Sequence, residues 1–296
     1  MRKILIIVFL AITGVIYALP IQVVTSFSIL ADVVKQVGGD KVKVSSIVGA
    51  NQDIHDYELK PSDIVNINNS KLLIINGLGL EAGWINNIVK SYKGHIVTAS
   101  YGINPLSMID KQHLVKQDPH IWSNPINIAN YYVPNILKAL IAISPQNADY
   151  FIKNANKYTK ELQELNCWVI SQLNSIPINK RQIITTHDSF AYFAKQYNLK
   201  FLSAQGISTD SEATAQDIAK LEHIIKTSNV KVVFLENMTN NQLIMQIAKD
   251  TKATIGGKLY SDALSYNNQP ANTYVKMIKY NVSTLVFYIN SDRKIK

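Results

Sequence analysis

Three of the six histidines in this chain stand where a parallel α/β sheet would present ligands. His55 lies in "IHDYE", shortly after the apolar run Val42–Val48, and His187 directly follows the apolar run Gln182–Thr186. His120 lies in "DPHIW", in a polar stretch before a helical run. Because ligands of parallel sheets bind just beyond the carboxyl ends of the strands, we expect these three imidazoles to face a binding site.

A fourth candidate of the same kind is Asp262 in "LYSDAL", which follows the glycine pair Gly256–Gly257. The four candidates are separated by 65, 67 and 75 residues, so no single helix face can carry them. They can meet only in a cleft between two lobes, with two ligands from each. Three imidazoles and one carboxylate suit Zn²⁺ or a similar first-row ion, and they complete four-coordination with protein groups alone. Such a closed site favours metal capture, because catalysis needs an open position for water.

The other three histidines, His95, His113 and His223, are interpreted as surface residues. His223 lies off the apolar stripe of its predicted helix. His113 stands alone in the polar loop "DKQHLVKQD", and a single histidine does not make a metal-gathering tract.

Two further motifs resemble functional signatures but lack the required spacing. "THDSF", Thr186–Phe190, has the residue types of a Ser-His-Asp triad, yet three sequence neighbours leaving a strand point in different directions and G-x-S-x-G is absent. "GLGLEAG", Gly77–Gly83, is spaced G-x-G-x-x-x-G, not G-x-G-x-x-G. It predicts a tight turn between a strand and a helix, not a phosphate-binding loop.

Short apolar runs alternate with longer helical patterns along most of the chain, which predicts an α/β fold with mostly parallel sheets. Strands are expected at Ile21–Thr25, Val42–Val48, Leu72–Asn76, His95–Thr98, Gln182–Thr186, Lys200–Leu202 and Val230–Leu235. Helices are expected at Ile29–Val37, Gly83–Ser91, Ile126–Leu140, Ser189–Tyr197, Ala215–Thr227 and Asn240–Thr251.

One segment, from Ser144 to Ile176, breaks this alternation because it lacks strand patterns and glycine. Its apolar residues recur every three or four positions, which predicts one long amphipathic helix; they are Tyr150, Phe151, Ala155, Tyr158, Leu162, Leu165, Val169 and Leu173. About 30 residues of helix would span ~45 Å, enough to connect two lobes. The expected organisation is a signal peptide at 1–18, an N-terminal α/β lobe at 19–143, a connecting helix at 144–176 and a C-terminal α/β lobe at 177–296.

The first eighteen residues have the pattern of a secretory signal peptide. Arg2 and Lys3 precede the apolar or small run Ile4–Ile16, and Ala18 offers a small residue for cleavage. The alternative is a membrane anchor, although the run is shorter than the ~20 residues that span a bilayer. No cysteine near the expected cleavage site could carry a lipid. We therefore expect a chain that is free in the periplasm.

Composition narrows the function further. The net charge is +9, but the basic residues are scattered, so nucleic acid is not an expected partner. Cys167 is the only cysteine, which excludes an internal disulfide and a cysteine-based zinc site. With 47% hydrophobic residues the chain can bury the cores of two domains.

Taken together, the motifs resemble the metal-binding subunits of bacterial ABC importers, the ZnuA- and TroA-type solute-binding proteins for zinc and manganese. The resemblance extends over nearly the whole chain. Its most specific pieces are H-x-Y-E and D-P-H-x-W, and it also includes "VVTSFSILADVVKQVGGDKVKVSSIVGANQDIHDYELKPSDI", "INGLGLEAGWINN", "TTHDSFAYFAKQYNL", "GISTDSEATAQDI", "VFLENM" and "LYSDALS".

The resemblance implies two Rossmann-like lobes, one long backbone helix, and a metal ion held between the lobes by His55, His120, His187 and Asp262. It implies a membrane permease and its ATPase as partners of a monomeric, non-enzymatic protein that captures one ion. Within the motif, Asp56 is expected to face solvent, whereas Tyr57 and Glu58 are expected to orient the loop. Four carboxylates, Asp118, Asp188, Glu58 and Glu236, are candidate partners for the second ring nitrogens of the histidines.

Two departures from the family pattern bear on the metal. Zinc-dedicated members carry a histidine- and acid-rich loop before the second ligand, whereas Ile103–Gln117 contains only His113. Manganese-leaning members often place glutamate at the third ligand position, where this chain has His187. Three imidazoles favour Zn²⁺ by ligand type, so we expect zinc first and manganese second. A zinc hydrolase, a binding protein for a metal chelate and an adhesin with structural metal are the alternatives.

Overall fold

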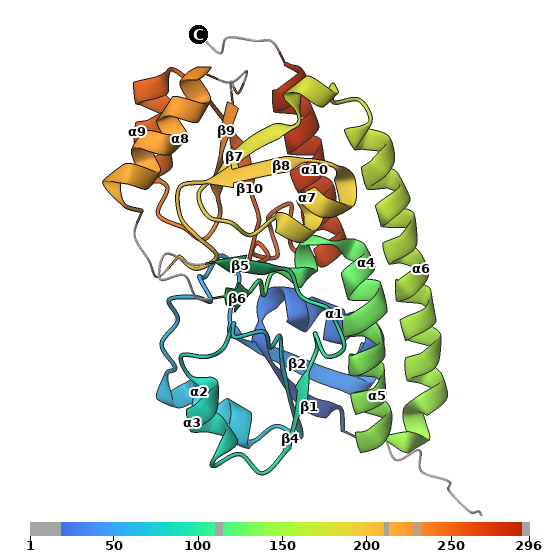
Figure 1. Ribbon diagram of the computed structural model, residues 1–296. Coiled ribbons are helices and arrows are strands. Elements are labelled where there is room, and N and C mark those ends of the chain that lie inside the picture. Colours follow the sequence, from blue (N-terminus) through green and yellow to red (C-terminus); the bar gives the residue numbers. More distant parts are fainter. Residues whose placement is uncertain (1–18, 110–114, 210–212, 228–229, 231, 292–296) are drawn as a thin grey trace, which may run out of the picture.

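The computed structural model describes residues 19–109, 115–209, 213–227, 230 and 232–291 of the 296-residue chain. The expected signal peptide at 1–18 and His113 lie outside the described residues. The described chain forms two α/β lobes, each built on a four-stranded parallel sheet, with one long helix alongside both (Figure 1). The fold class predicted from the sequence is therefore confirmed.

The first lobe contains the sheet β2-β1-β3-β4, in which every neighbouring pair of strands is parallel. Its strands are β1 (Ile21–Phe27), β2 (Val42–Val48), β3 (Leu72–Ile75) and β4 (His95–Thr98). Its helices are α1 (Ser28–Gly38), α2 (Pro61–Asn68), α3 (Ile85–Val89), α4 (Pro125–Asn127) and α5 (Val133–Ile143), with a π-helical turn at Ile128–Tyr132 between the last two. All of β3 is buried, as a strand covered on both faces should be.

The second lobe repeats this plan with the parallel sheet β10-β9-β7-β8. Its strands are β7 (Gln182–Thr185), β8 (Lys200–Ser203), β9 (Val232–Glu236) and β10 (Thr254–Leu259). Its helices are α7 (Ala191–Tyr197), α8 (Ala215–Thr227), α9 (Gln242–Thr251) and α10 (Tyr274–Asn290). Figure 1 shows α8 and α9 on the outer side of this sheet and α10 on the side that faces the long helix.

All seven expected strands form, but the structure contains elements that the sequence patterns did not predict. They are the helices α2 and α10, the strand β10, and an antiparallel hairpin of β5 (Ser107–Ile109) and β6 (Val115–Gln117). β10 was missed because Gly256 and Gly257 suggest a turn. In the fold these glycines allow close packing, since a Cβ at Gly256 would lie 2.7 Å from Phe234 and one at Gly257 would lie 2.6 Å from Thr284 on α10.

The long helix α6 (Ala148–Leu173) is shorter than the expected 144–176, because a 3₁₀ turn at Pro145–Asn147 precedes it and it ends before Pro177. Its 26 residues span about 39 Å. Its buried stripe is the predicted one except for Tyr150, which is 36% exposed and accepts a hydrogen bond from the backbone of Asp40. α6 packs on α1 and α5 of the first lobe and on α10 of the second, so it supports both lobes along one side (Figure 1).

A single hydrophobic core runs from the first sheet through these helices into the second lobe, and a smaller one lies under α8 and α9. Cys167 is a free, exposed cysteine on α6. Within the described ranges, no helix has both the length and the apolar character needed to cross a membrane.

Candidate metal centre

His55, His120, His187 and Asp262 converge between the carboxyl ends of the two sheets. One ligand atom from each side chain can be chosen so that all four lie within 4.8 Å of one another. His55 follows β2, His120 follows the β5–β6 hairpin, His187 follows β7 and Asp262 follows β10. The structure therefore brings together all four side chains that are predicted from the sequence as ligands, two from each lobe.

The spacing of the four groups fits a small first-row ion. Oδ2 of Asp262 lies 3.0 Å from Nε2 of His187 and 3.3 Å from Nε2 of His55, while Oδ1 lies 3.8 Å from Nε2 of His120. The Nε2 atoms of His55 and His120 are 3.2 Å apart. Tetrahedral ligands about 2.0–2.1 Å from a Zn²⁺ ion would be about 3.3 Å from one another. The cluster is thus close to the size that the ion requires.

The site is almost closed to solvent. The side chains of His120, His187 and Asp262 are 0% exposed, and that of His55 is 5% exposed. Both carboxylate oxygens of Asp262, both ring nitrogens of His187 and Oε2 of Glu236 are buried and lack a hydrogen bond of good geometry to any described residue, although ion-pair contacts at 2.7 and 3.0 Å join them. Because buried polar atoms are normally satisfied, these are ligand atoms that a cation could bind.

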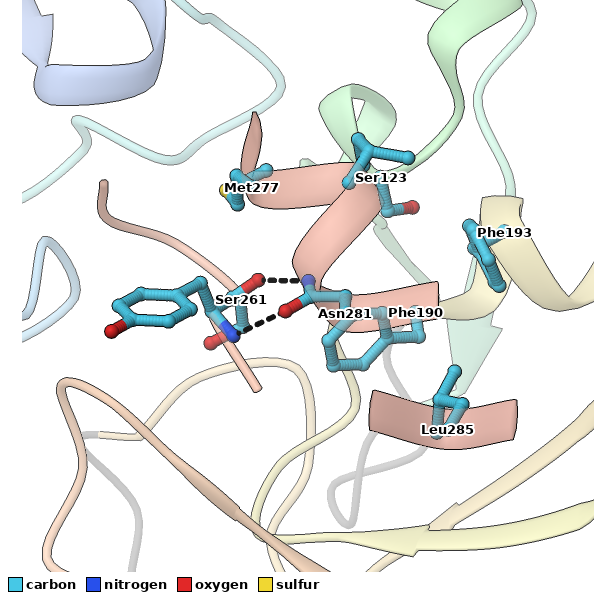
Figure 2. A pocket seen from close by; sticks show the side chains of 9 residues that line it. Ser123, Phe190, Phe193, Ser261, Met277, Asn281 and Leu285 are labelled. Atoms are coloured by element: carbon cyan, nitrogen blue, oxygen red, sulfur yellow. Dashed lines mark hydrogen bonds between the residues drawn. The ribbon is translucent and has the colours of Figure 1, made fainter. Parts of the chain in front are cut away.

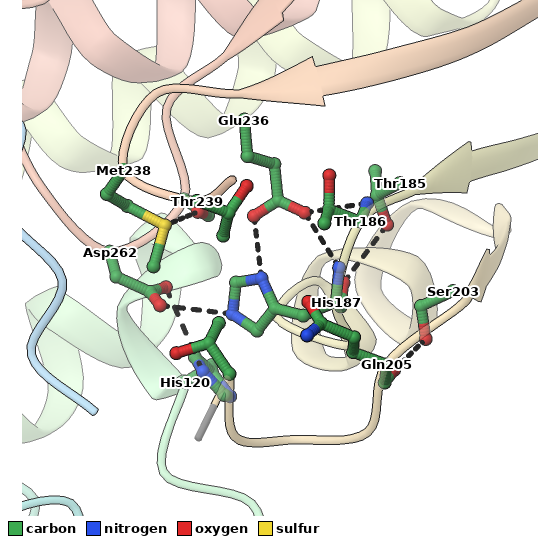
Figure 3. Close-up of polar contacts among 12 residues, drawn as sticks. His120, Thr185, Thr186, His187, Ser203, Gln205, Glu236, Met238, Thr239 and Asp262 are labelled. Carbon is green, nitrogen blue, oxygen red and sulfur yellow. Dashed lines mark hydrogen bonds and ion pairs between the residues drawn. The ribbon is translucent and has the colours of Figure 1, made fainter. Parts of the chain in front are cut away.

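Two carboxylates fix the orientation of two of the imidazoles. Asp118 Oδ1 lies 2.8 Å from Nδ1 of His120. Glu236 Oε2 lies 2.7 Å from Nδ1 of His187 (Figure 3). With Nδ1 of each ring facing its carboxylate, Nε2 faces Asp262 at the centre of the cluster. The other two candidates from the sequence do not take this role, because Nδ1 of His120 and Nδ1 of His187 face Asp118 and Glu236 instead of Glu58 or Asp188.

Each of these carboxylates also binds the backbone of the loop that carries its histidine. Asp118 Oδ1 accepts the N–H of His120 at 2.9 Å, and Glu236 Oε1 accepts the N–H groups of both Thr186 and His187 at 2.9 Å. His55 is held through its backbone instead, because its N–H donates to Asp53 Oδ1 at 2.9 Å.

Of the two neighbours of His55 that were expected to orient its loop, Tyr57 does so, whereas Glu58 is exposed. The Tyr57 hydroxyl donates to Asp63 Oδ2 at 2.9 Å, which ties the loop to α2, while Asp56 is exposed to solvent. Of the polar residues in "IHDYE", only the histidine therefore reaches the cluster.

The charges in the cluster reinforce one another. Burial raises the pKa of Asp262, but His187 and His120 outweigh it and hold that pKa well below its usual range. Burial lowers the pKa of His187, but Glu236 and Asp262 outweigh it and raise that pKa well above its usual range. Before metal binds, the site therefore contains an ionised carboxylate beside an imidazole that tends to keep its proton.

Hydrogen bonds beside the ligands join the two lobes. The Trp122 indole N–H donates to the carbonyl of Ser261, the residue before Asp262, at 2.8 Å. The Tyr192 hydroxyl donates to the carbonyl of Asp118 at 2.8 Å and accepts the N–H of Leu106. No sequence pattern predicted these contacts, because they join segments far apart in the chain.

The rejected motifs have structural roles. His187 in "THDSF" faces Glu236 and Asp262, so no Ser-His-Asp triad forms. In "GLGLEAG" the Glu81 carboxylate accepts the backbone N–H groups of Asn76 and Gly77, and thus occupies the position that a phosphate would need. His95 and His223 are exposed, as predicted.

A small cavity lies beside the site, between the 3₁₀ turn Ile121–Ser123, α7 and α10. Figure 2 shows Ser123, Phe190, Met277 and Asn281 around it, and Asn281 donates to and accepts from the backbone of Tyr260. Its volume is about 10 Å³, room for one water molecule. This cavity is far too small for a metal chelate.

The sequence matches one protein family and several characterised relatives. The model of the family described as "Zinc-uptake complex component A periplasmic" matches residues 23–287. The iron-binding protein YfeA of Yersinia pestis is 33% identical over 267 residues, which cover 89% of this chain and 85% of the relative. The manganese ABC transporter substrate-binding lipoprotein PsaA of Streptococcus pneumoniae is 31% identical over 277 residues, which cover 91% of this chain and 89% of the relative.

The fold is also similar to a solved structure of the periplasmic zinc-binding protein TroA from Treponema pallidum. The TM-score is 0.85 at 27% sequence identity, and the match covers 91% of this chain and 99% of that chain.

Proposed function

Because this chain belongs to the zinc-uptake complex component A family of metal-binding ABC substrate-binding proteins, we propose that it captures one divalent transition metal ion and delivers it to a membrane permease. His55, His120, His187 and Asp262 are the proposed ligands. The observation that supports the proposal is their convergence, from four separate segments of two lobes, with buried oxygen and nitrogen atoms that have no hydrogen-bond partner among the described residues.

We propose Zn²⁺ as the first cargo and Mn²⁺ as the second. Three imidazoles are borderline-soft ligands, and the Irving–Williams order places Zn²⁺ far above Mn²⁺ at such a site. The relatives PsaA and YfeA are named for manganese and for iron. The metal that the protein carries can therefore depend on which ion the compartment supplies as well as on the ligand types.

The experiment that tests the function is native mass spectrometry of protein purified from its own cells without added metal. One Zn²⁺ or Mn²⁺ per chain is the expected result, and competition calorimetry between the two ions then ranks them. Protein that arrives without metal and binds neither ion would overturn the proposal. Growth under metal starvation with and without the protein distinguishes import from a structural role in adhesion.

The proposed partners are the permease and its ATPase, with the binding protein acting as a monomer. We propose the organisation given by the sequence, with lobes at 19–143 and 177–296 and a connector at 144–176. We place the chain in the periplasm on the basis of the leader pattern at 1–18. PsaA is named a lipoprotein, so the intact mass of the mature chain is the measurement that distinguishes a free protein from a lipid-bearing one.

A further inference from the structure

The segment that leads into His55 is fastened to the second lobe through Asn51. The Asn51 backbone N–H donates to the carbonyl of Leu264 at 2.9 Å, two residues after Asp262. Its side-chain Oδ1 accepts a hydrogen bond from Nδ2 of Asn237 at 3.0 Å. Asn51 has φ +54°, the left-handed conformation that asparagine tolerates better than most residues.

Asn237 occupies a junction between the proposed ligand segments. It follows Glu236, the carboxylate that orients His187, and its side-chain Nδ2 also donates to the carbonyl of Ala263 at 3.2 Å. Its backbone N–H donates to the carbonyl of Leu259 at the end of β10. One asparagine of the second lobe thus contacts both the segment before His55 and the segment that carries Asp262.

A second connection to the other lobe lies between Asn51 and His55. Asp53 Oδ2 accepts a hydrogen bond from the Thr209 hydroxyl at 2.6 Å, and Asp53 Oδ1 accepts the backbone N–H of His55. The Asp53 carboxylate therefore connects Thr209 of the second lobe directly to the backbone of a proposed ligand.

We propose that Asn51 and Asp53, with their partners Asn237 and Thr209, form an inter-lobe clasp that holds His55 against the other three ligands and sets the rate at which the metal leaves. This proposal rests on the proposed function. His55 is the most exposed of the four ligands, so it lies on the side where an ion would leave. The clasp bonds form only while its loop lies on the second lobe.

Asn51 and Asp53 are positioning residues, because they act through the backbone of His55 and do not touch the ion. Weakening the clasp should therefore shorten the time that metal stays bound without removing a ligand. A net hydrogen bond of ordinary strength corresponds to about a three- to tenfold change in rate.

Two substitutions weaken the clasp at separate points. Asn51→Gly removes the side chain while keeping the left-handed backbone accessible, and Thr209→Val removes one hydroxyl at similar volume. Two matched controls leave the clasp in place. Thr209→Ser keeps the hydroxyl, and Gln269→Ala removes only the exposed contact of Asn51 Nδ2 with Gln269 Oε1.

The release rate is measured by mixing protein loaded with Zn²⁺, and separately with Mn²⁺, with excess chelator in a stopped-flow instrument. Asn51→Gly and Thr209→Val should each release metal about three- to tenfold faster than the native chain. The Thr209→Ser and Gln269→Ala variants should release it at the native rate. Metal binding should raise the Tm of Asn51→Gly and of Thr209→Val by less than it raises the Tm of the native chain. It should raise the Tm of the two controls as much as that of the native chain.

The possible failures are distinguishable. If the native chain binds neither ion, the proposed function fails and the clasp fails with it. If the native chain binds metal but Asn51→Gly and Thr209→Val release it at the native rate, the clasp alone is overturned. An equal fall in Tm with and without metal, at an unchanged release rate, would also overturn it, because the bonds would then only stabilise the fold.

Discussion

The Glu236 carboxylate binds His187 twice, once through the imidazole and once through the backbone. Oε2 lies 2.7 Å from Nδ1 of the ring, while Oε1 accepts the N–H groups of His187 and Thr186. The first lobe uses the same device at the end of β3, where Glu81 accepts the N–H groups of Asn76 and Gly77. The two lobes thus share a carboxylate that holds the backbone beyond a strand, but only Glu236 also orients a proposed ligand.

This relationship predicts that Glu236→Gln will weaken metal binding more than it destabilises the fold. The amide oxygen can still accept backbone hydrogen bonds, but the negative charge facing the His187 ring is lost. We expect affinity for Zn²⁺ to fall by about 10- to 100-fold, the usual cost of losing an outer partner of a ligand. Calorimetric titration of the metal-free protein measures it.

Glu81→Gln is the matched control, since it makes the same chemical change on the corresponding carboxylate of the other lobe. It should lower Tm but leave affinity for Zn²⁺ unchanged. Equal losses of affinity in the two variants would show that Glu236 acts only through the stability of its lobe.

A second prediction concerns Asp262, the only carboxylate in the proposed ligand set. Asp262→Ala should reduce metal affinity more than Glu236→Gln does. It removes a ligand atom, and it removes the only negative charge among the four proposed ligands. Asp56→Ala, next to His55 but exposed, should bind metal as the native chain does. An Asp262→Ala protein that retained tight binding would revive the zinc hydrolase alternative, with water in the fourth position.

Much of this architecture could be predicted from the sequence, because the signals were local or strongly periodic. Runs such as Val42–Val48 and Leu72–Asn76 identify buried strands by composition alone. His55 and His187 could be predicted because ligands of parallel sheets bind beyond the carboxyl ends of the strands. His120 follows an antiparallel hairpin and Asp262 follows a strand that no pattern predicted, so the prediction of these two residues depended on their motifs.

The elements that were missed depend on packing between distant segments. β10 contains Gly256, which normally indicates a turn but here makes room for Phe234. Likewise, Tyr150 fits the apolar stripe of α6 by spacing, yet it lies at the surface and contacts Asp40. The contacts of Asn51 with Asn237 and of Trp122 with Ser261 join segments more than a hundred residues apart, and no local pattern encodes them.

The pKa of His187 predicts how metal affinity depends on pH. Burial lowers this pKa, but Glu236 and Asp262 raise it well above its usual value. The metal-free site therefore keeps a proton that a cation must displace. Affinity should rise with pH through the ordinary histidine value of about 6.5 and continue to rise up to the raised pKa of His187, with proton release on binding. Calorimetry in two buffers of different ionisation enthalpy measures that release, and a flat affinity without it would contradict the prediction.

The raised pKa of His187 also determines whether the metal-free protein becomes more or less stable as pH rises. A raised folded-state pKa means that protonated His187 stabilises the fold fully below the unfolded value of about 6.5. That contribution is lost as pH rises through the folded-state pKa. The Tm of metal-free protein should therefore fall toward alkaline pH, and saturating Zn²⁺ should reduce the fall. The exposed His223 provides the control, since His223→Gln should leave both profiles unchanged.

Gly256→Ala should destabilise the second lobe. A Cβ at this position would lie 2.7 Å from Cε1 of Phe234 and 2.9 Å from Cγ1 of Val232, and Phe234 is fully buried. Overpacking of this kind costs about 1–3 kcal/mol, which urea unfolding can measure. Gly83→Ala is the control, because a Cβ there meets nothing within 4 Å. Equal stability of the two variants would mean that β10 can move away from Phe234 at little cost.

The hydrogen bonds between the lobes predict that metal binding changes loops and leaves the lobe orientation nearly fixed. Trp122 binds the carbonyl of Ser261 and Tyr192 binds that of Asp118, while α6 packs against helices of both lobes. Small-angle scattering should therefore give the same radius of gyration for metal-free and Zn²⁺-loaded protein. Trp122→Phe removes the indole donor, so its metal-free form should be more expanded and should compact on loading. A large compaction of the native chain would show that these bonds form only after the ion has bound.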